Sequence, residues 1–215
     1  TTVKIMKYIF VVGAPGSRWS GVANSIYYSE QIDQSDDTPK RTYFNPKSPP
    51  KAKKLMHRGA YFDPGMEFGH ELENFDTLSK QDLEKIFDAP FQGSDKIRII
   101  KSHVLSKHVD RLADLFDDPI VLVYRHDQDC FDWWRQAGGW DITYPNYQWY
   151  EDDETMKKQI ASQNQSIRNF VSKHRLYSFI DNIQLQKTLG IQSMNYLRFT
   201  DVEVYCKIKN ESENS

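Results

Sequence analysis

The sequence predicts an α/β protein in which helices flank a mainly parallel sheet. Three short apolar runs have the composition of buried strands, and a segment with helical spacing follows each of them. The expected strands are 5–13, 96–103 and 119–125, and the expected helices after them are 20–30, 104–116 and 127–138. Regular alternation of strands and helices is typical of parallel sheets, because the crossover between two parallel strands is usually a helix.

Two further elements are expected toward the C-terminus. The segment 151–175 begins with acidic residues, and its apolar side chains recur along one side, as in an amphipathic helix. Those side chains are Met156, Ile160, Ile167 and Phe170. A last strand is expected at 193–200. The length of 215 residues fits one domain, which we place at 1–206 and follow with a polar tail at 207–215.

Composition and charge exclude several classes of protein. The net charge of −2 is unlike the basic excess of general nucleic-acid-binding domains, so no nucleic acid is expected as a partner. Apolar runs stay shorter than the roughly 18 residues of a membrane span, and the start of the chain shows no cleavage-type site. The cysteines, Cys130 and Cys206, lack the spacing of a zinc site. We therefore expect a cytoplasmic protein with reduced thiols and no metal.

The polar segment 31–58 departs from this neutral character. After the acidic run DQSDD, seven basic residues gather around three prolines. The basic residues are Lys40, Arg41, Lys47, Lys51, Lys53, Lys54 and Arg58. A loop of this length inside a compact domain is usually a functional lid or a mobile segment. Two interpretations stay open, a basic lid over an anionic ligand and a solvated surface loop.

Polar residues follow each expected parallel strand, at the end where such folds bind ligands. The first strand leads into a turn formed by Gly13, Ala14, Pro15, Gly16, Ser17, Arg18, Trp19 and Ser20. The second strand ends in Lys101, Ser102 and His103, and the third in Arg125, His126 and Asp127. A strand, a glycine-rich turn and a helix in this order suit a phosphate-like anion, because the first helical amides lack internal partners. We expect the three strand ends to lie side by side and to form an anion site.

The turn differs from the phosphate loop of nucleotide triphosphatases, G-x-x-x-x-G-K-[ST]. Gly13 and Ser20 match this pattern, but Arg18 and Trp19 stand where the second glycine and the lysine belong. Without that lysine the β- and γ-phosphates lose their main cation. The other two strands end in Ser-His and Tyr-Arg rather than in a carboxylate for magnesium. The sequence therefore disfavours a nucleotide triphosphatase.

Three segments together resemble the sulfotransferase family, whose members transfer a sulfuryl group from 3′-phosphoadenosine 5′-phosphosulfate (PAPS) to a hydroxyl or amine. VVGAPGSRWS resembles the family's 5′-phosphosulfate loop, and IIKSHVLSKH resembles its K-[TS]-H segment. PIVLVYRHDQDCFDWW resembles the strand and helix that carry the 3′-phosphate arginine. The resemblance covers residues 5–137. It implies a phosphate-loop-like, three-layer fold, a metal-free reaction and a small-molecule or glycan acceptor.

The resemblance also implies roles for individual residues. His103 is expected to be the general base, and Lys101 is expected to be a cation beside the donor. The turn 13–20 is expected to bind the 5′ side of the donor, and Arg125 is expected to bind its 3′-phosphate. Independently of the resemblance, Lys101 and His103 are two positions apart, so their side chains point to one face of a strand. An imidazole with an ordinary pKa of about 6.5 is suited to removing a hydroxyl proton.

Other residues are expected to complete an acceptor pocket. The aromatic residues between positions 133 and 150 are expected mostly in the core, with some along the pocket. Glu67, His70 and Glu71 are reserve candidates for the base.

Two positions depart from the family pattern. Gly16 stands where the loop usually has lysine or arginine, so that charge is expected from Arg18. Trp133 replaces a serine that contacts the 3′-phosphate in many members. These differences keep open a non-catalytic protein that binds adenosine 3′,5′-bisphosphate. A kinase with an altered phosphate loop is the other alternative.

Overall fold

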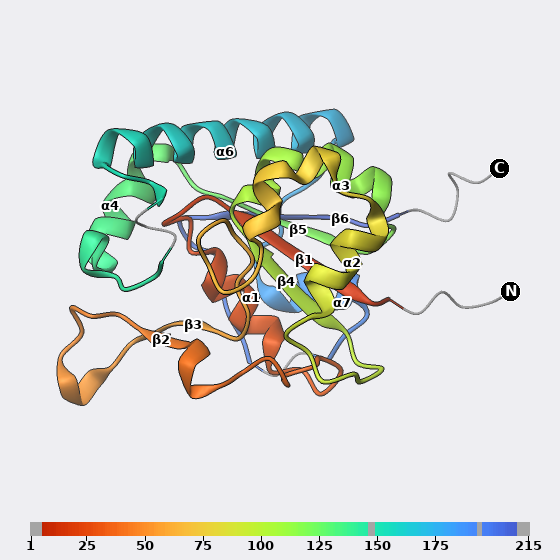
Figure 1. Ribbon diagram of the computed structural model, residues 1–215, viewed down its shortest axis with the longest axis horizontal. Coiled ribbons are helices and arrows are strands. Elements are labelled where there is room, and N and C mark those ends of the chain that lie inside the picture. The colour runs from red at the N-terminus through yellow and green to blue at the C-terminus, as the bar shows by residue number, and fades with distance from the viewer. Residues whose placement is uncertain (1–5, 146–148, 193–194, 210–215) are drawn as a thin grey trace, which may run out of the picture.

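The sheet at the centre of the fold has four strands in the order β4–β1–β5–β6 (Figure 1). The computed structural model describes residues 6–145, 149–192 and 195–209. The strands are β1 (Tyr8–Gly13), β4 (Arg98–Ser102), β5 (Ile120–Tyr124) and β6 (Glu203–Lys207). β1 pairs in parallel with β4 and with β5, whereas β6 is antiparallel to β5. The three strands expected to be parallel are therefore neighbours, and their carboxyl ends meet at one edge.

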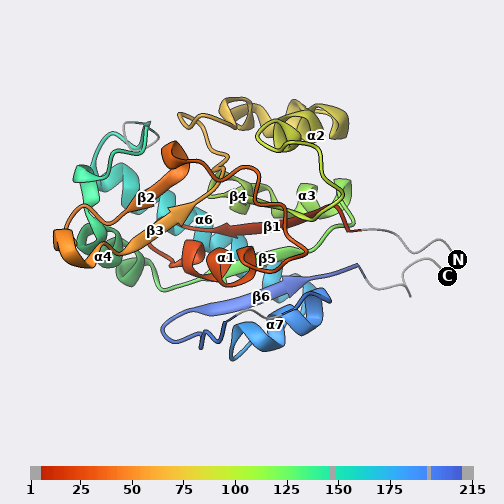
Figure 2. The ribbon, with the colours of Figure 1, turned by 90° about the horizontal axis from the view of Figure 1, so that it is seen from below.

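Helices cover both faces of the sheet, which confirms the expected α/β architecture (Figure 2). The face with α1 (Trp19–Tyr27) and α7 (Asn182–Leu189) lies opposite the face with α2 (Lys80–Asp88) and α3 (Val109–Leu115). α4 (Asp127–Ala137) packs against α6 (Asp153–His174). Along β1, Ile9 and Val11 face the α1 side, while Phe10 and Val12 face the α2 side. Short 3₁₀ segments lie at Pro39–Arg41, Pro50–Ala52, His70–Thr77, Val104–His108 and Gly139–Asp141.

The amphipathic helix expected at 151–175 is confirmed as α6. The carboxylate of Asp152 accepts a hydrogen bond from the Thr155 amide, at 2.7 Å, and caps the first turn. Arg175, in the left-handed conformation, ends the helix. The apolar side chains that predicted this helix are all buried, namely Met156, Ile160, Ile167 and Phe170.

The prediction of a last strand at 193–200 is wrong for its described part. Residues 195–200 form only an isolated bridge to Asp181, and the strand β6 comes later. In β6, Val204 and Cys206 are buried while their neighbours reach outward, and this period of two identifies the strand. The polar tail was expected to begin at residue 207, but Lys207 is the last residue of β6. Positions 193–194 and 210–215 lie outside the described residues.

The segment 31–58 is not a structureless loop. Its first part follows the edge of the sheet, where the amide of Asp33 donates a 2.8 Å hydrogen bond to the carbonyl of Ile97. A short antiparallel hairpin follows, formed by β2 (Thr42–Phe44) and β3 (Leu55–Arg58). Its outer part extends from the body of the fold (Figure 1). None of the helices in the described ranges has the length and apolar character needed to cross a membrane.

Candidate functional site

The loop between β1 and α1 has the properties of an anion site. α1 starts at Trp19, and no side chain caps its first turn. Amides at a helix N-terminus point outward at the positive end of the helix. The hydroxyl of Ser17 is buried and has no hydrogen-bond partner among the described residues. An anion in this loop would provide hydrogen-bond acceptors for the amides and for this hydroxyl.

Close contact between the loop and α4 explains the glycine at position 16. A Cβ on Gly16 would lie 1.8 Å from the carbonyl oxygen of Cys130, and the φ angle of Gly16 is +77°. Both facts favour glycine. The lysine or arginine usual at this place in the loop that the segment resembles therefore has no room here.

Arg18 carries the positive charge of the loop instead. It precedes the first residue of α1 and has a left-handed backbone conformation, with a φ angle of 66°. This conformation is strained for a residue with a Cβ. Its guanidinium lies over the indole of Trp133, with 5.1 Å from Cζ to the ring centroid. The loop thus has a cation at its mouth.

Three cations converge on the indole of Trp133. Besides Arg18, the Nζ of Lys54 lies 4.7 Å and the Cζ of Arg125 lies 5.5 Å from the ring centroid. None of the three forms an ion pair with a carboxylate in the part of the chain that the structure describes. The Nε of Arg125 is also buried without a hydrogen-bond partner there. A bound anion would relieve the mutual repulsion of these charges, so the cluster is a candidate anion site.

Lys54 and Trp133 were not assigned to the site from the sequence. Lys54 belongs to the basic segment 31–58, and the hairpin brings it across to α4. Trp133 was noted as a replacement for a serine of the family pattern and as one of the aromatic residues between 133 and 150, some of which were expected along the pocket. In the structure its ring is the surface on which the three cations meet.

His103 stands at the end of β4, next to the loop. Its Nδ1 is hydrogen-bonded to the carbonyl oxygen of Gly13. Because a carbonyl only accepts, the proton of the neutral ring is on Nδ1 and Nε2 keeps its lone pair. The ring packs against Trp19 and Tyr61, with centroid distances of 4.6 and 5.3 Å. Burial lowers the pKa of His103, while the Asp63 carboxylate and the Gly13 bond oppose this effect. His103 is therefore placed to act as a neutral base.

The buried carboxylate of Asp63 holds this strand end in position. It accepts hydrogen bonds from the hydroxyl of Ser102 at 2.8 Å and from the amides of His103 and Val104 at 3.1 and 2.9 Å. It therefore fixes the backbone that carries His103. Sequence analysis missed this residue. The only local signal is its position in an Asp-Pro-Gly run, which is typical of a turn.

Lys101 lies in β4, but His103 follows the strand with helical backbone angles, so the strand alternation that predicted a shared face does not reach it. Lys101 donates a hydrogen bond to the carbonyl of Arg58, and its Nζ lies 5.2 Å from the ring centroid of Tyr27. Burial lowers the pKa of Lys101 to about 8, and nearby aspartates, chiefly Asp36, oppose the shift. The structure thus places this cation outside the wall of the pocket that His103 lines.

A small pocket, partly open to solvent, adjoins the loop at 13–20 (the anion loop). Its wall is largely aromatic, and none of the described residues that line it is a carboxylate. The lining residues are Gly16, Arg18, Trp19, Ser20, Met56, His57, Tyr61, His103, Trp133, Trp134, Ala137, Ile142 and Tyr144. The anion loop and the candidate base therefore border the same space.

The three reserve bases do not line this pocket. Glu67 accepts two hydrogen bonds from Arg41, at 2.6 and 2.9 Å, and these lower the pKa of its carboxyl. His70 and Glu71 are exposed at the start of a 3₁₀ segment. His57, which the sequence did not single out as a site residue, lines the pocket instead.

The described residues bring together no group of three or more side chains able to hold a metal ion. Comparisons of the chain with protein-family models, with curated proteins and with solved structures find no match. Function is therefore argued from the geometry of this site and from the three sequence segments.

Replacement of Arg18 by glycine should separate backbone strain from anion binding. Glycine adopts this conformation freely, so Arg18→Gly is expected to raise the free energy of unfolding by about 1 kcal/mol while weakening the binding of inorganic pyrophosphate. Arg175→Gly is the matched control, because Arg175 also has a positive φ angle, 51°, but ends α6 far from the loop (Figure 1). Urea unfolding and calorimetry measure the two effects. Equal loss of pyrophosphate binding in both variants would contradict the assignment.

Stability should fall as the pH drops below about 6.5. Burial lowers the pKa of both His57 and His103 below the ordinary value of 6.5, so the unfolded chain binds protons in this range before the folded chain does. The loss is expected to approach about 1.4 kcal/mol per pH unit for each histidine. Urea unfolding between pH 7 and 5 measures this slope, and His57→Phe should reduce it. An unchanged slope in that variant would show that His57 does not contribute.

Proposed function

We propose that this protein is a PAPS-dependent sulfotransferase. The observation that carries the proposal is the hydrogen bond between His103 and Gly13, because it fixes the candidate base directly beside the anion loop. The cations at the mouth of that loop and the aromatic pocket beside it supply the two binding regions that a transfer reaction requires.

The donor would occupy the loop and the cation cluster. In this scheme the loop amides and Arg18 bind the 5′-phosphosulfate, and Arg125 binds the 3′-phosphate. The unpartnered Ser17 hydroxyl and Arg125 Nε support this assignment, because charged phosphate or sulfate oxygens are strong hydrogen-bond acceptors. Lys54 would add a third cation from the hairpin, as a lid would.

The acceptor would lie in the aromatic pocket with its hydroxyl or amine toward His103. The acceptor atom forms a bond to sulfur as the bond from sulfur to the bridging oxygen breaks. Nε2 of His103 takes the acceptor's proton, and the electron pair of the broken bond leaves on the adenosine 3′,5′-bisphosphate. Loop amides and arginines near the departing phosphate stabilise the charge that develops there.

Lys101 has a supporting place in this mechanism. Its buried positive charge makes the electrostatic potential behind the pocket more positive. Together with burial, this charge lowers the pKa of His57. Direct contact between Lys101 and the leaving group would require its ammonium to release the carbonyl of Arg58.

Calorimetry with paired nucleotides tests the donor site. The protein should bind adenosine 3′,5′-bisphosphate more tightly than 5′-AMP, and Arg125→Ala should weaken the bisphosphate by roughly 1.5–3 kcal/mol with little effect on 5′-AMP. The AMP measurement is the internal control, because AMP lacks only the 3′-phosphate. Equal losses for both ligands would refute the role of Arg125, and a preference for ATP would favour a kinase.

Kinetics of a His103 variant test the catalytic assignment. His103→Asn keeps a donor for the Gly13 carbonyl but removes Nε2, so turnover should fall about 10²- to 10⁴-fold with donor affinity nearly intact. With the natural protein the rate should rise with pH through a limb below 6.5, since burial lowers the pKa of His103. A panel of phenols, alcohols, amines and sugars with labelled PAPS provides the acceptor.

His108→Asn is the matched control for this experiment. His108 packs against Phe75 and pairs with Asp76 at 3.2 Å, and it does not line the pocket. Turnover by His103→Asn at the rate of the natural protein would make His103 a structural residue.

A further inference from the structure

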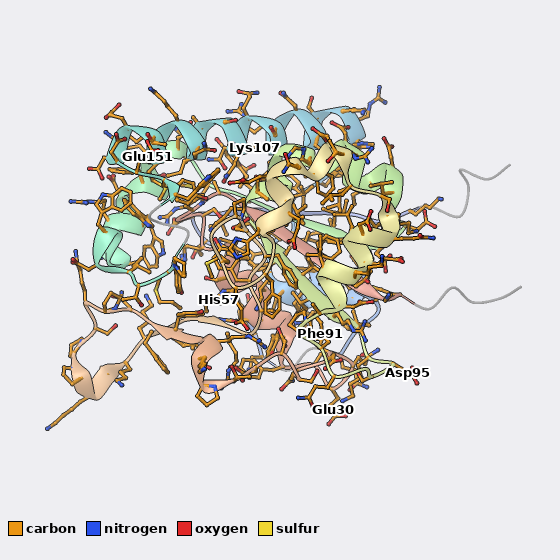
Figure 3. The ribbon with its side chains drawn as sticks, viewed as in Figure 1. Glu30, His57, Phe91, Asp95, Lys107 and Glu151 are labelled. Carbon is orange, nitrogen blue, oxygen red and sulfur yellow. The ribbon has the colours of Figure 1, made fainter. Side chains whose placement is uncertain are left out.

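The buried face of α6 contains a polar residue, Asn164, that contacts the turn after β5. Asn164 lies four residues after Ile160 and three before Ile167, so it belongs to the same face of the helix. The residue is only 1% exposed. Figure 3 shows Lys107 beside this helix, and its ammonium donates a hydrogen bond to the side chain of Gln159. The helix that carries Asn164 is therefore fixed against the rest of the fold.

The side-chain amide of Asn164 is bonded to the backbone of a candidate anion ligand, Arg125. Its Nδ2 donates one hydrogen bond of 2.7 Å to the carbonyl of Arg125 and another of 2.7 Å to the carboxylate of Asp127. Both partners only accept, so the amide has its nitrogen rather than its oxygen toward the turn. The carbonyl of Arg125 also accepts a hydrogen bond from the thiol of Cys130, at 3.3 Å. Side chains of α4 and α6 thus hold this carbonyl together.

The same arrangement leaves one polar atom of Asn164 without a partner. Its Oδ1 is buried and accepts no hydrogen bond from the described residues. A buried acceptor that stays unsatisfied lowers stability, so an apolar side chain would be the better choice if this position only filled the core. The hydrogen bonds from Nδ2 offset that cost, and one of them ends on Arg125.

The guanidinium of Arg125 is weakly held by its own contacts. Its Nη1 lies 3.5 Å from the carbonyl oxygen of Gly16, at the limit of a hydrogen bond, and its Nε has no partner among the described residues. Binding of phosphate or sulfate by a guanidinium depends on the direction of its N–H groups. That direction depends here on where the backbone of Arg125 is fixed.

We propose that Asn164 is a positioning residue of the anion site, and that it holds the backbone of Arg125 so that the guanidinium faces the anion loop. Asn164 does not touch the anion, and its whole effect on binding passes through Arg125. This inference rests on the proposed function only in taking Arg125 as the ligand of an anion.

Calorimetry with inorganic pyrophosphate tests the proposal. Asn164→Ala should weaken pyrophosphate binding about 3- to 10-fold, the effect of one neutral hydrogen bond. Arg125→Ala should weaken it at least about 10-fold, because it removes a charged ligand. The double variant should bind as weakly as Arg125→Ala to within about 2-fold, since Asn164 has nothing to position once the guanidinium is absent.

Gln163→Ala is the matched control. Gln163 precedes Asn164 on α6, is equally buried and also has a side-chain oxygen without a partner among the described residues, so this variant should bind pyrophosphate like the natural protein. Asn164→Leu repeats the test without a cavity and should show the same loss as Asn164→Ala. The variants should fold, because Asp127 is exposed and the carbonyl of Arg125 keeps the thiol of Cys130. Thermal unfolding checks this.

Three results would overturn the proposal. The first is natural affinity for pyrophosphate in both Asn164 variants, or no binding by the natural protein. The second is a loss from Asn164→Ala that adds in full to that from Arg125→Ala, because additive losses indicate that Asn164 does not act through the guanidinium. The third is an equal loss in Gln163→Ala, which would indicate a general effect of changing the buried face of α6.

The outcome is separable from that of the proposed function. Pyrophosphate contains no adenosine, so a protein that binds it without preferring adenosine 3′,5′-bisphosphate to 5′-AMP would contradict the sulfotransferase assignment. The comparison of single and double variants would still decide the role of Asn164.

Discussion

The site depends on the absence of a side chain at Gly13. A Cβ there would lie 2.7 Å from the hydroxyl of Ser17, 2.9 Å from the Cβ of Trp19 and 3.0 Å from the carbonyl oxygen of Val123. The loop, α1 and β5 therefore all pack closely against Gly13. Its carbonyl in turn accepts the hydrogen bond of His103, so one glycine sets the distance between the anion loop and the candidate base. A methyl group at this position would force these elements apart.

Burial keeps the imidazoles of the pocket neutral, and at His57 a buried charge behind the pocket adds to this effect. The Asp36 carboxylate accepts hydrogen bonds from the hydroxyl of Tyr27 at 2.7 Å and from the amide of Ala60 at 2.6 Å, and its charge favours the protonated form of Lys101. Buried ions lower stability unless partners surround them, and here each has at least one. The positive charge of Lys101 then disfavours a second cation at His57. A residue outside the pocket wall thus helps to keep His57 neutral.

Local pattern was sufficient to predict the parallel strands at the centre of the fold and the edge at which their carboxyl ends meet. The apolar runs of β1, β4 and β5 and the turn after β1 are contiguous in sequence, so their order placed the strand ends together. Lys54, His57 and Asp63 were not predicted as site residues. They reach the site through the hairpin and the turn after it, and contacts between residues so far apart in the sequence leave no local periodicity. The last strand was misplaced because an apolar stretch before β6 has a strand-like composition although only β6 alternates.

The three cations around Trp133 give this nearly neutral chain a strongly uneven field. At physiological ionic strength a surface charge is felt over only about 8 Å, so the cluster attracts anions that are already near the pocket mouth. Capture of a small anion should therefore be faster in dilute buffer than in concentrated salt. The hairpin contributes one of these charges, because it carries Lys54 to the indole of Trp133 on α4.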